Sequence, residues 1–152
     1  MIVYADTSWW VAYKWSDDSN RLRAIALFDR WEDARVVWTP WQRVEVFNAL
    51  RQLERRGAML TSNAREFIRI LEQEVRLGYW PHVEFDWRDA VRAACELSAE
   101  LSLGFPMRGM DLFNVAIAIA IGAEALLTFD SDQKAFAEAA GLRVLRLTSQ
   151  SG

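Results

Sequence analysis

Four acidic residues lie where predicted strands give way to helices, and residues of this type in such positions suit metal chemistry. Asp6 follows the short apolar run at residues 2–4, and Asp130 follows a second such run. Glu45 lies near the start of one predicted helix, and Asp111 begins another that is strongly apolar. A carboxylate at the end of a buried strand costs free energy unless a cation or a hydrogen-bond donor meets it. Asp6 therefore requires a partner, and the other three acids are candidates to share its site.

Each acid also has an ordinary structural explanation. Asp6 and Asp130 could simply cap the helices that follow them. Asp111 could stabilise its helix by about 0.3–1 kcal/mol through the helix dipole, and Glu45 could face solvent. Taken together these explanations are weaker, because four carboxylates gathered at one edge of a sheet would repel one another unless a divalent cation neutralised them.

The available ligands favour magnesium or manganese over zinc. The chain has one histidine, His82, and one cysteine, Cys95, without paired spacing, whereas carboxylate oxygens suit the harder cations. Hydrated magnesium held by acids suits phosphoryl chemistry, since it lowers the pKa of a water, aligns it with phosphorus and stabilises the leaving oxygen. No histidine base is then required, so His82 is predicted to be structural or exposed. Cys95 is predicted to be a buried, inert thiol.

Hydrophobic periodicity predicts the elements that must position these acids. Strands are predicted at residues 2–4, 35–39, 123–128 and 142–147, with a weaker one at 82–85. Helices are predicted after a cap at 7–8, over 21–31 and 41–56, after a cap at 61–63, and over 87–101, 110–121 and 134–140. Such alternation predicts a three-layer α/β/α domain with a mainly parallel sheet of about four or five strands, because each parallel return needs a crossover. The functional crevice of such a sheet lies at the carboxyl ends of its strands.

Length and composition fit one globular domain. The 152 residues are expected to form a single domain over 1–152 that buries about 70% of its unfolded surface. With 52% hydrophobic and 26% charged residues, the composition excludes a disordered or fibrous class. No apolar run reaches the length of a membrane span and no leader is evident, so a cytoplasmic protein without membrane contact is expected.

Net charge gives no general attraction for nucleic acid. The chain carries a formal charge of −3 at pH 7, so binding to RNA or DNA would have to rest on local charge. One predicted helix gathers several arginines, whose planar fork suits phosphate but equally suits surface carboxylates. They are Arg43, Arg51, Arg55 and Arg56.

The residues around the four acids form motifs in a fixed order. Asp6 lies in Ala-Asp-Thr-Ser, Glu45 in Val-Glu-Val-Phe-Asn-Ala-Leu, Asp111 in Arg-Gly-Met-Asp-Leu-Phe-Asn-Val-Ala, and Asp130 in Leu-Leu-Thr-Phe-Asp-Ser-Asp. In this order, and over essentially the whole chain, they resemble the PIN-domain nucleases. Within that family they are most similar to the VapC-type toxins of bacterial and archaeal toxin–antitoxin pairs.

This resemblance implies a magnesium- or manganese-dependent endoribonuclease in which Asp6, Glu45, Asp111 and Asp130 are catalytic and bind the metal. It also implies an RNA substrate, a cognate antitoxin with a segment lying in an apolar groove between helices, and a homodimer. Several polar residues are candidates to assist the acids, to orient a metal-bound water or to bind a substrate phosphate: Thr7, Ser8, Asn48, Arg108, Asn114, Thr128 and Asp132. Asp132 could also substitute for Asp130.

The chain departs from the family pattern in two respects. Many of the family's toxins carry a His or similar polar residue shortly after the third acid, but here Leu-Phe-Asn follows Asp111, which leaves the choice of substrate open. The chain also has eight tryptophans. Trp9, Trp10 and Trp41 follow predicted strand ends and could stack on unpaired bases. Otherwise they belong to the core or cover a partner-binding groove.

Two other functions stay open at this level. An aspartate after the first strand also serves aspartyl-phosphate phosphatases and receiver domains. The haloacid-dehalogenase type of phosphatase has a second Asp two residues on, where this chain has Ser8, and a receiver has a Lys after a late strand, where this chain has Asp130 with Lys134 four residues later. The remaining alternative is a PIN-like domain retained for binding alone, against which the intact set of acids argues.

Overall fold

The computed structural model describes residues 1–59 and 63–147. In this part of the chain the strands are β1 (Ile2–Ala5), β2 (Arg35–Val37), β3 (Ala125–Leu127) and β4 (Arg143–Val144). The helices are α1 (Thr7–Lys14), α2 (Arg21–Arg30), α3 (Pro40–Arg55), α4 (Ala64–Arg76), α5 (Trp87–Leu101), α6 (Gly109–Ala120) and α7 (Ser131–Ala139). All strand pairs are parallel, in the order β2-β1-β3-β4.

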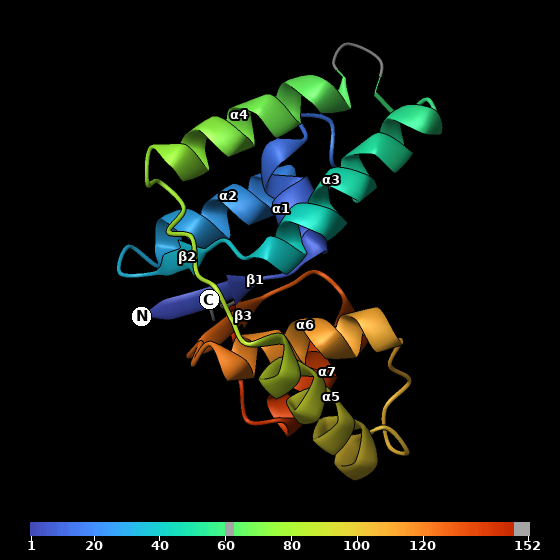
Figure 1. Ribbon diagram of the computed structural model, residues 1–152. Helices are drawn as coiled ribbons and strands as arrows, with labels where there is room; N and C mark the ends of the chain where they lie inside the picture. Colours follow the sequence, from blue (N-terminus) through green and yellow to red (C-terminus); the bar gives the residue numbers. More distant parts are fainter. Residues whose placement is uncertain (60–62, 148–152) are drawn as a thin grey trace, which may run out of the picture.

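The sheet lies between two layers of helices (Figure 1), with α1 to α4 on one face and α5 to α7 on the other. Successive side chains of a strand point to opposite faces. In β1, Val3 and Ala5 therefore pack in the core under α1 to α4, whereas Tyr4 packs in the core under α5 to α7. Leu127 and Leu126 of β3 divide in the same way. The predicted three-layer α/β/α fold with a parallel sheet is confirmed.

The central position of β1 brings the chain segments after three strands to one edge of the sheet. β1 pairs with both β2 and β3, and Ala5 lies opposite Leu127. The ladder continues one residue beyond β1, because the Asp6 N–H donates to the Leu127 carbonyl at 3.0 Å. Asp6 therefore lies directly beside the residues that follow β3.

The start of α3 is fixed to the same edge. Thr39 caps the helix, Pro40 occupies its first position, and Thr39 and Gln42 form a reciprocal capping box. The Gln42 side chain also donates to the Ala5 carbonyl at the end of β1. This buried contact ties α3 to β1, so that Glu45, almost one turn later, faces the edge where Asp6 lies.

Several local predictions are corrected by the structure. Residues 82–85 form no strand, since only His82 makes a bridge, to Trp38, before α5 begins at Trp87. Cys95 is exposed, because the buried face of α5 runs through Ala90 and Leu97. The predicted strand at 142–147 is shortened to β4.

The cap of α1 differs from the predicted one, whereas the cap of α4 is one of the predicted residues. Asp6 caps α1, one residue before the predicted Thr7 and Ser8, because its carboxylate accepts from the Trp9 N–H. Asn63 caps α4, whereas residues 61–62 of the predicted cap lie outside the described part of the chain. The hydroxyls of Thr7 and Ser8 do not cap the helix and instead donate to the side chains of Glu45 and Asp6.

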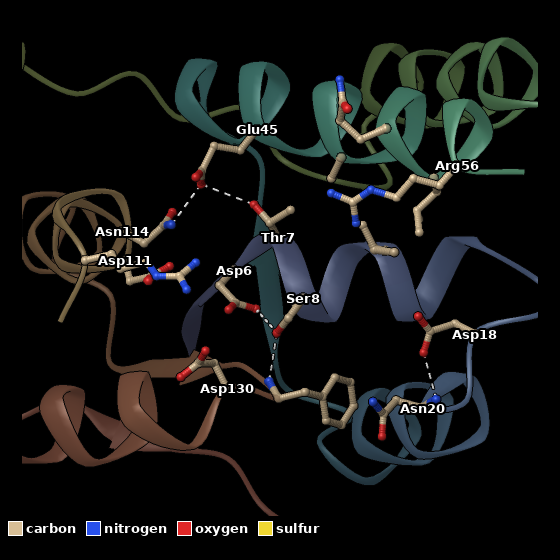
Figure 2. A pocket seen from close by; sticks show the side chains of 16 residues that line it. Asp6, Thr7, Ser8, Asp18, Asn20, Glu45, Arg56, Asp111, Asn114 and Asp130 are labelled. Carbon is tan, nitrogen blue, oxygen red and sulfur yellow. Dashed lines mark hydrogen bonds between the residues drawn. The ribbon is translucent and has the colours of Figure 1, made fainter. Parts of the chain in front are cut away.

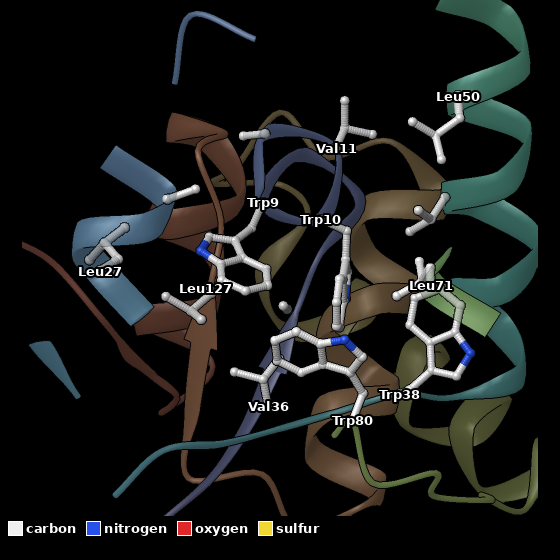
Figure 3. Close-up of a cluster of buried hydrophobic side chains, with 14 of the residues drawn as sticks. Trp9, Trp10, Val11, Leu27, Val36, Trp38, Leu50, Leu71, Trp80 and Leu127 are labelled. Carbon is white, nitrogen blue, oxygen red and sulfur yellow. The ribbon is translucent and has the colours of Figure 1, made fainter. Parts of the chain in front are cut away.

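The tryptophans of α1 belong to the core and not to an RNA-binding surface (Figure 3). Trp9 and Trp10 are both 0% exposed. Trp10 packs edge-on against Trp38 and Trp80, with ring centroids 5.0 Å away in each case. Trp41 is half-buried and packs against Phe113 and Trp87. The prediction that Trp9 and Trp10 could stack on bases is wrong, because α1 turns both side chains inward. Within residues 1–59 and 63–147, no helix has both the length and the apolar character needed to cross a bilayer.

Candidate active site

A cavity of about 670 Å³ opens at the carboxyl edge of the sheet, and all four predicted acids line it. They come from separate elements: the end of β1, helix α3, helix α6 and the segment after β3 (Figure 2). Four of the predicted assisting residues also line the cavity, namely Thr7, Ser8, Arg108 and Asn114. Acids that are spread over 125 positions of the chain, from residue 6 to residue 130, thus meet in one place.

Asp6 is the most buried of the acids, at 5% exposure. Its Oδ1 accepts hydrogen bonds from the Trp9 N–H at 3.0 Å and from the Ser8 hydroxyl at 2.7 Å. Its Oδ2 accepts from the Thr128 hydroxyl at 2.7 Å. Three donors from α1 and the end of β3 therefore fix the orientation of the carboxylate.

Burial dominates the electrostatics of Asp6. The pKa of the carboxyl is raised from 3.8 to about 6, chiefly by burial, and the nearby charge of Asp130 acts in the same direction. The hydrogen bonds from Ser8, Thr128 and Trp9 stabilise the charged form and act in the opposite direction. The net shift is upward, so the site disfavours the negative charge of Asp6 unless a cation is close.

Glu45 is held by a chain of hydrogen bonds that reaches across the sheet. Its Oε2 accepts from Asn114 Nδ2 at 2.8 Å and from the Thr7 hydroxyl at 3.1 Å. The Asn114 carbonyl oxygen accepts from the Tyr4 hydroxyl at 2.7 Å, which directs the amide N–H groups of Asn114 toward Glu45. Burial and the charge of Asp111 raise the pKa of Glu45. Burial and the charge of Glu45 also raise the pKa of Tyr4, so this hydroxyl keeps its proton and remains a donor.

Asp111 and Asp130 begin adjacent helices. Asp111 lies in the first turn of α6, where burial raises its pKa, Asp130 raises it further and Arg108 lowers it. Asp130 is exposed and caps α7, since its Oδ1 accepts from the Gln133 N–H at 2.8 Å. The Gln133 side chain donates to the Asp111 carbonyl at 3.1 Å. This bond ties the two helix starts together, and Asp130 is both a cap and a wall of the cavity.

Comparison with known proteins identifies the family. The PIN domain family model matches residues 3–140. The chain belongs to the PIN domain family. A search of curated proteins gives no sequence match.

Solved structures similar to this PIN domain include toxins and toxin–antitoxin complexes. VapBC2 from Rickettsia felis, bound to a promoter DNA fragment, has a TM-score of 0.66 at 17% identity, over 97% of this chain and 100% of that one. VapC20 from Mycobacterium tuberculosis, described as a sarcin-ricin loop cleaving toxin, has 0.63 at 17%, over 92% and 95%. FitAcB from Neisseria gonorrhoeae has 0.62 at 16%, over 96% and 97%. At this identity the likeness shows the fold, which agrees with the resemblance drawn from the sequence.

Three predicted assisting residues of the PIN domain lie outside the wall of the acid cavity. Thr128 is buried behind it, where it donates to Asp6 and accepts from the Asp130 N–H at 3.0 Å. Asn48 and Asp132 are exposed and do not line the cavity. Asn48 is displaced because the helix face of Glu45 continues four residues on and not three.

The cavity is also lined by residues that were not predicted from the sequence. Ala49, Gln52 and Arg56 of the segment from α3 to its cap follow Glu45 at intervals of four, seven and eleven positions, which is one face of a helix. That spacing could have singled out Arg56 from the other arginines of the helix. Asp18 and Asn20 line the cavity from the segment before α2 (Figure 2). Tyr4, which holds Asn114 from behind the cavity, could not be predicted, because nothing in the sequence distinguishes it from an ordinary strand residue.

The raised pKa of Asp6 predicts how the stability of the metal-free PIN domain depends on pH. Because the folded-state pKa is about 6 against 3.8, the unfolded state loses its proton at lower pH. The contribution of Asp6 to stability is therefore present at low pH and is lost as pH rises to about 6. A shift of this size corresponds to about 3 kcal/mol, at about 1.4 kcal/mol per unit.

Asp6→Asn should remove this dependence. With EDTA present, the variant should gain stability relative to the wild type between pH 4 and pH 7, by chemical denaturation at each pH. Magnesium should then raise the Tm of the wild type at pH 7 but not that of the variant. If the stability difference between Asp6→Asn and the wild type were the same at pH 4 and at pH 7, the raised pKa of Asp6 would be contradicted.

Proposed function

We propose that this PIN domain is a metal-dependent endoribonuclease, with magnesium or manganese as its cofactor, and that it is the toxin of a toxin–antitoxin pair. One observation carries the proposal: Asp6, Glu45, Asp111 and Asp130 line a single cavity. Within residues 1–59 and 63–147, none of them forms an ion pair with a Lys or Arg. Their charges are therefore left for a cation that is not part of the chain.

The donor set fits magnesium. Burial raises the pKa of Asp6, Glu45 and Asp111, so a bound cation would stabilise their charged forms. In the described part of the chain, no three acidic, His or Cys side chains are grouped closely enough to hold a metal ion between them. Magnesium keeps several of its waters and needs about one or two direct carboxylates, so a loosely spaced set of acids suits it better than it suits zinc. When bound, the ion would supply a Lewis acid for the phosphodiester and an activated water.

The chain's own residues prepare the site for that chemistry. Ser8, Thr128 and the Trp9 N–H hold Asp6, and Thr7 and Asn114 hold Glu45, so these two acids need little reorganisation. Arg108 and Arg56 line the same cavity. Their guanidinium groups are candidates to bind the phosphates of the substrate on either side of the acids.

The proposed partner is an antitoxin. The similar VapBC2 structure is a complex of a VapB with a VapC bound to promoter DNA, and the sequence resemblance implies a partner segment in an apolar groove. A cavity of about 420 Å³ lined by Tyr13, Phe28, Glu74, Tyr79 and Trp80 fits that expectation. A homodimer is proposed on the same resemblance.

Aspartyl-phosphate chemistry is less well supported. Asp6 is 5% exposed and both of its carboxylate oxygens accept hydrogen bonds, which is a poor arrangement for a nucleophile. Lys134, the lysine that a receiver would need, borders a different cavity. A PIN domain retained for binding alone would have no need for four acids that line one cavity.

The proposal is tested by incubating the protein with single-stranded and structured RNA, with and without magnesium. Cleavage is expected only with the metal, and Asp111→Asn should abolish it while keeping the fold by circular dichroism. Cleavage in EDTA, or full activity in both Asp111→Asn and Asp6→Asn, would refute the assignment. Labelling of Asp6 by a phosphate mimic would favour aspartyl-phosphate chemistry instead.

A further inference from the structure

A second cavity, of about 220 Å³, lies at the same edge of the sheet as the acids. It is lined by three cationic side chains, Arg23 of α2, Lys134 of α7 and Arg146 after β4. Thr128 and Phe129 form its wall toward the acids. Phe129 also lines the acid cavity, so the two cavities are neighbours with one residue between them.

Two of the cations, Arg23 and Lys134, lie over the Phe129 ring. The Arg23 Cζ lies 5.3 Å and the Lys134 Nζ 5.9 Å from the ring centroid. Their positions suit cation–π attraction, and the Phe129 ring that they contact is a wall of both cavities. Arg23 also donates to the side-chain oxygen Oδ1 of Asn20 at 3.1 Å. This fixes the guanidinium without neutralising it.

The cluster carries more positive than negative charge. Arg146 pairs with Glu138 at 2.8 Å, but among the described residues Lys134 forms neither an ion pair nor a side-chain hydrogen bond. Burial lowers the pKa of Lys134, and Arg23 and Arg146 lower it further. Three cations that repel one another in a recess are stabilised by an anion with several oxygens.

The position of the cluster indicates which anion. Phe129 lines both cavities, and Thr128, which lines the cationic recess, donates to Asp6 at 2.7 Å, so the recess borders the acid site directly. A free anion would have no reason to bind beside four carboxylates, whereas an RNA strand whose scissile phosphodiester lies at the acids must place its next phosphate within a short distance. Phosphate contacts of this kind position a nucleic acid without reading its sequence.

We propose that Arg23, Lys134 and Arg146 form a subsite for the RNA backbone phosphate that neighbours the scissile one. This subsite rests on the proposed nuclease function. It would set the register of the strand relative to the acids, and it would supply local positive charge to a chain whose net charge is −3.

Binding of a short single-stranded RNA is measured by fluorescence anisotropy in the Asp6→Asn background, over a range of salt concentrations. Lys134→Gln should weaken binding about tenfold and lower the salt slope by about 1. Arg69→Gln, which removes one exposed arginine of α4 that lines neither cavity, is the matched control and should change neither. Glu138→Gln frees Arg146 and should strengthen binding by roughly twofold.

A chemical scan of the RNA identifies the phosphate. Replacing one backbone phosphate at a time by a neutral methylphosphonate should weaken binding at a single position next to the cleavage site. At that position Lys134→Gln should add no further loss. Additive losses at every position, or equal binding by Lys134→Gln and the parent protein, overturn the subsite.

The subsite and the nuclease can fail separately. If the wild type cleaves RNA and Lys134→Gln binds RNA as tightly as the parent protein, the subsite is refuted and the nuclease function is retained. A different result would be a wild-type protein that does not cleave RNA but binds inorganic phosphate, with this binding abolished in Lys134→Gln. That result would contradict both the nuclease function and the assignment of the subsite to RNA. If Lys134→Gln lost binding to an acidic antitoxin peptide but bound RNA as the parent protein does, the cluster would be assigned to a protein partner instead.

Discussion

Asp6→Asn is expected to lower the rate of RNA cleavage by on the order of 10³-fold or more while leaving the fold intact. Asn is nearly isosteric with Asp and retains an oxygen that can accept from the Trp9 N–H and the Ser8 hydroxyl, the contacts that cap α1. What it removes is the charge that a divalent cation requires. Single-turnover cleavage with saturating magnesium measures the loss.

Asp132→Asn is the matched control for this change. Asp132 follows Asp130 by two residues and is exposed, but it does not line the acid cavity. Its replacement also removes one carboxylate charge, from the first turn of α7, and should alter the rate less than about threefold, as for an ordinary surface substitution. If Asp132→Asn lost as much activity as Asp6→Asn, the effect would be one of general charge and not of the site.

Trp10→Ala is expected to lower the free energy of unfolding by about 3–5 kcal/mol, a large part of the total for a domain with about 5–15 kcal/mol. Trp10 is 0% exposed and contacts the edges of Trp38 and Trp80, so truncation leaves a large cavity between α1 and the sheet. Denaturant unfolding at neutral pH measures the loss.

Trp87→Ala provides the comparison, because Trp87 is 47% exposed at the start of α5. Its truncation should cost much less than that of Trp10. A Trp10→Ala protein with unchanged stability and weaker RNA binding would contradict the core assignment of Trp10. It would indicate instead that Trp10 stacks on bases.

Local sequence patterns were sufficient for much of the fold and for the meeting of the acids. Apolar runs and helical periodicity locate most elements within a few residues, and parallel alternation alone requires that Asp6 and Asp130 lie at one edge. The order of the strands does not follow from the sequence. It depends on β1 pairing with both β2 and β3, and it is this order that places Asp6 directly beside the segment that holds Asp130.

Side-chain direction accounts for most of what the sequence could not predict. Trp9 and Trp10 follow a strand end, as a substrate-binding residue would, but the rotation of α1 buries both. Tyr4 is a buried strand residue whose hydroxyl reaches Asn114 across the sheet. This contact depends on the distance between two elements that are 110 positions apart, and no local pattern encodes such a distance.

The proposed nuclease requires that Asp6, Glu45, Asp111 and Asp130 together form one metal-dependent centre. A crystal of the wild-type protein soaked in manganese, with anomalous diffraction recorded near the manganese edge, tests it most directly. We expect an anomalous peak inside the cavity that these acids line, in direct contact with at least one carboxylate, and no such peak in Asp6→Asn. Manganese bound elsewhere on the protein, with the cavity empty at millimolar metal, would contradict the assignment.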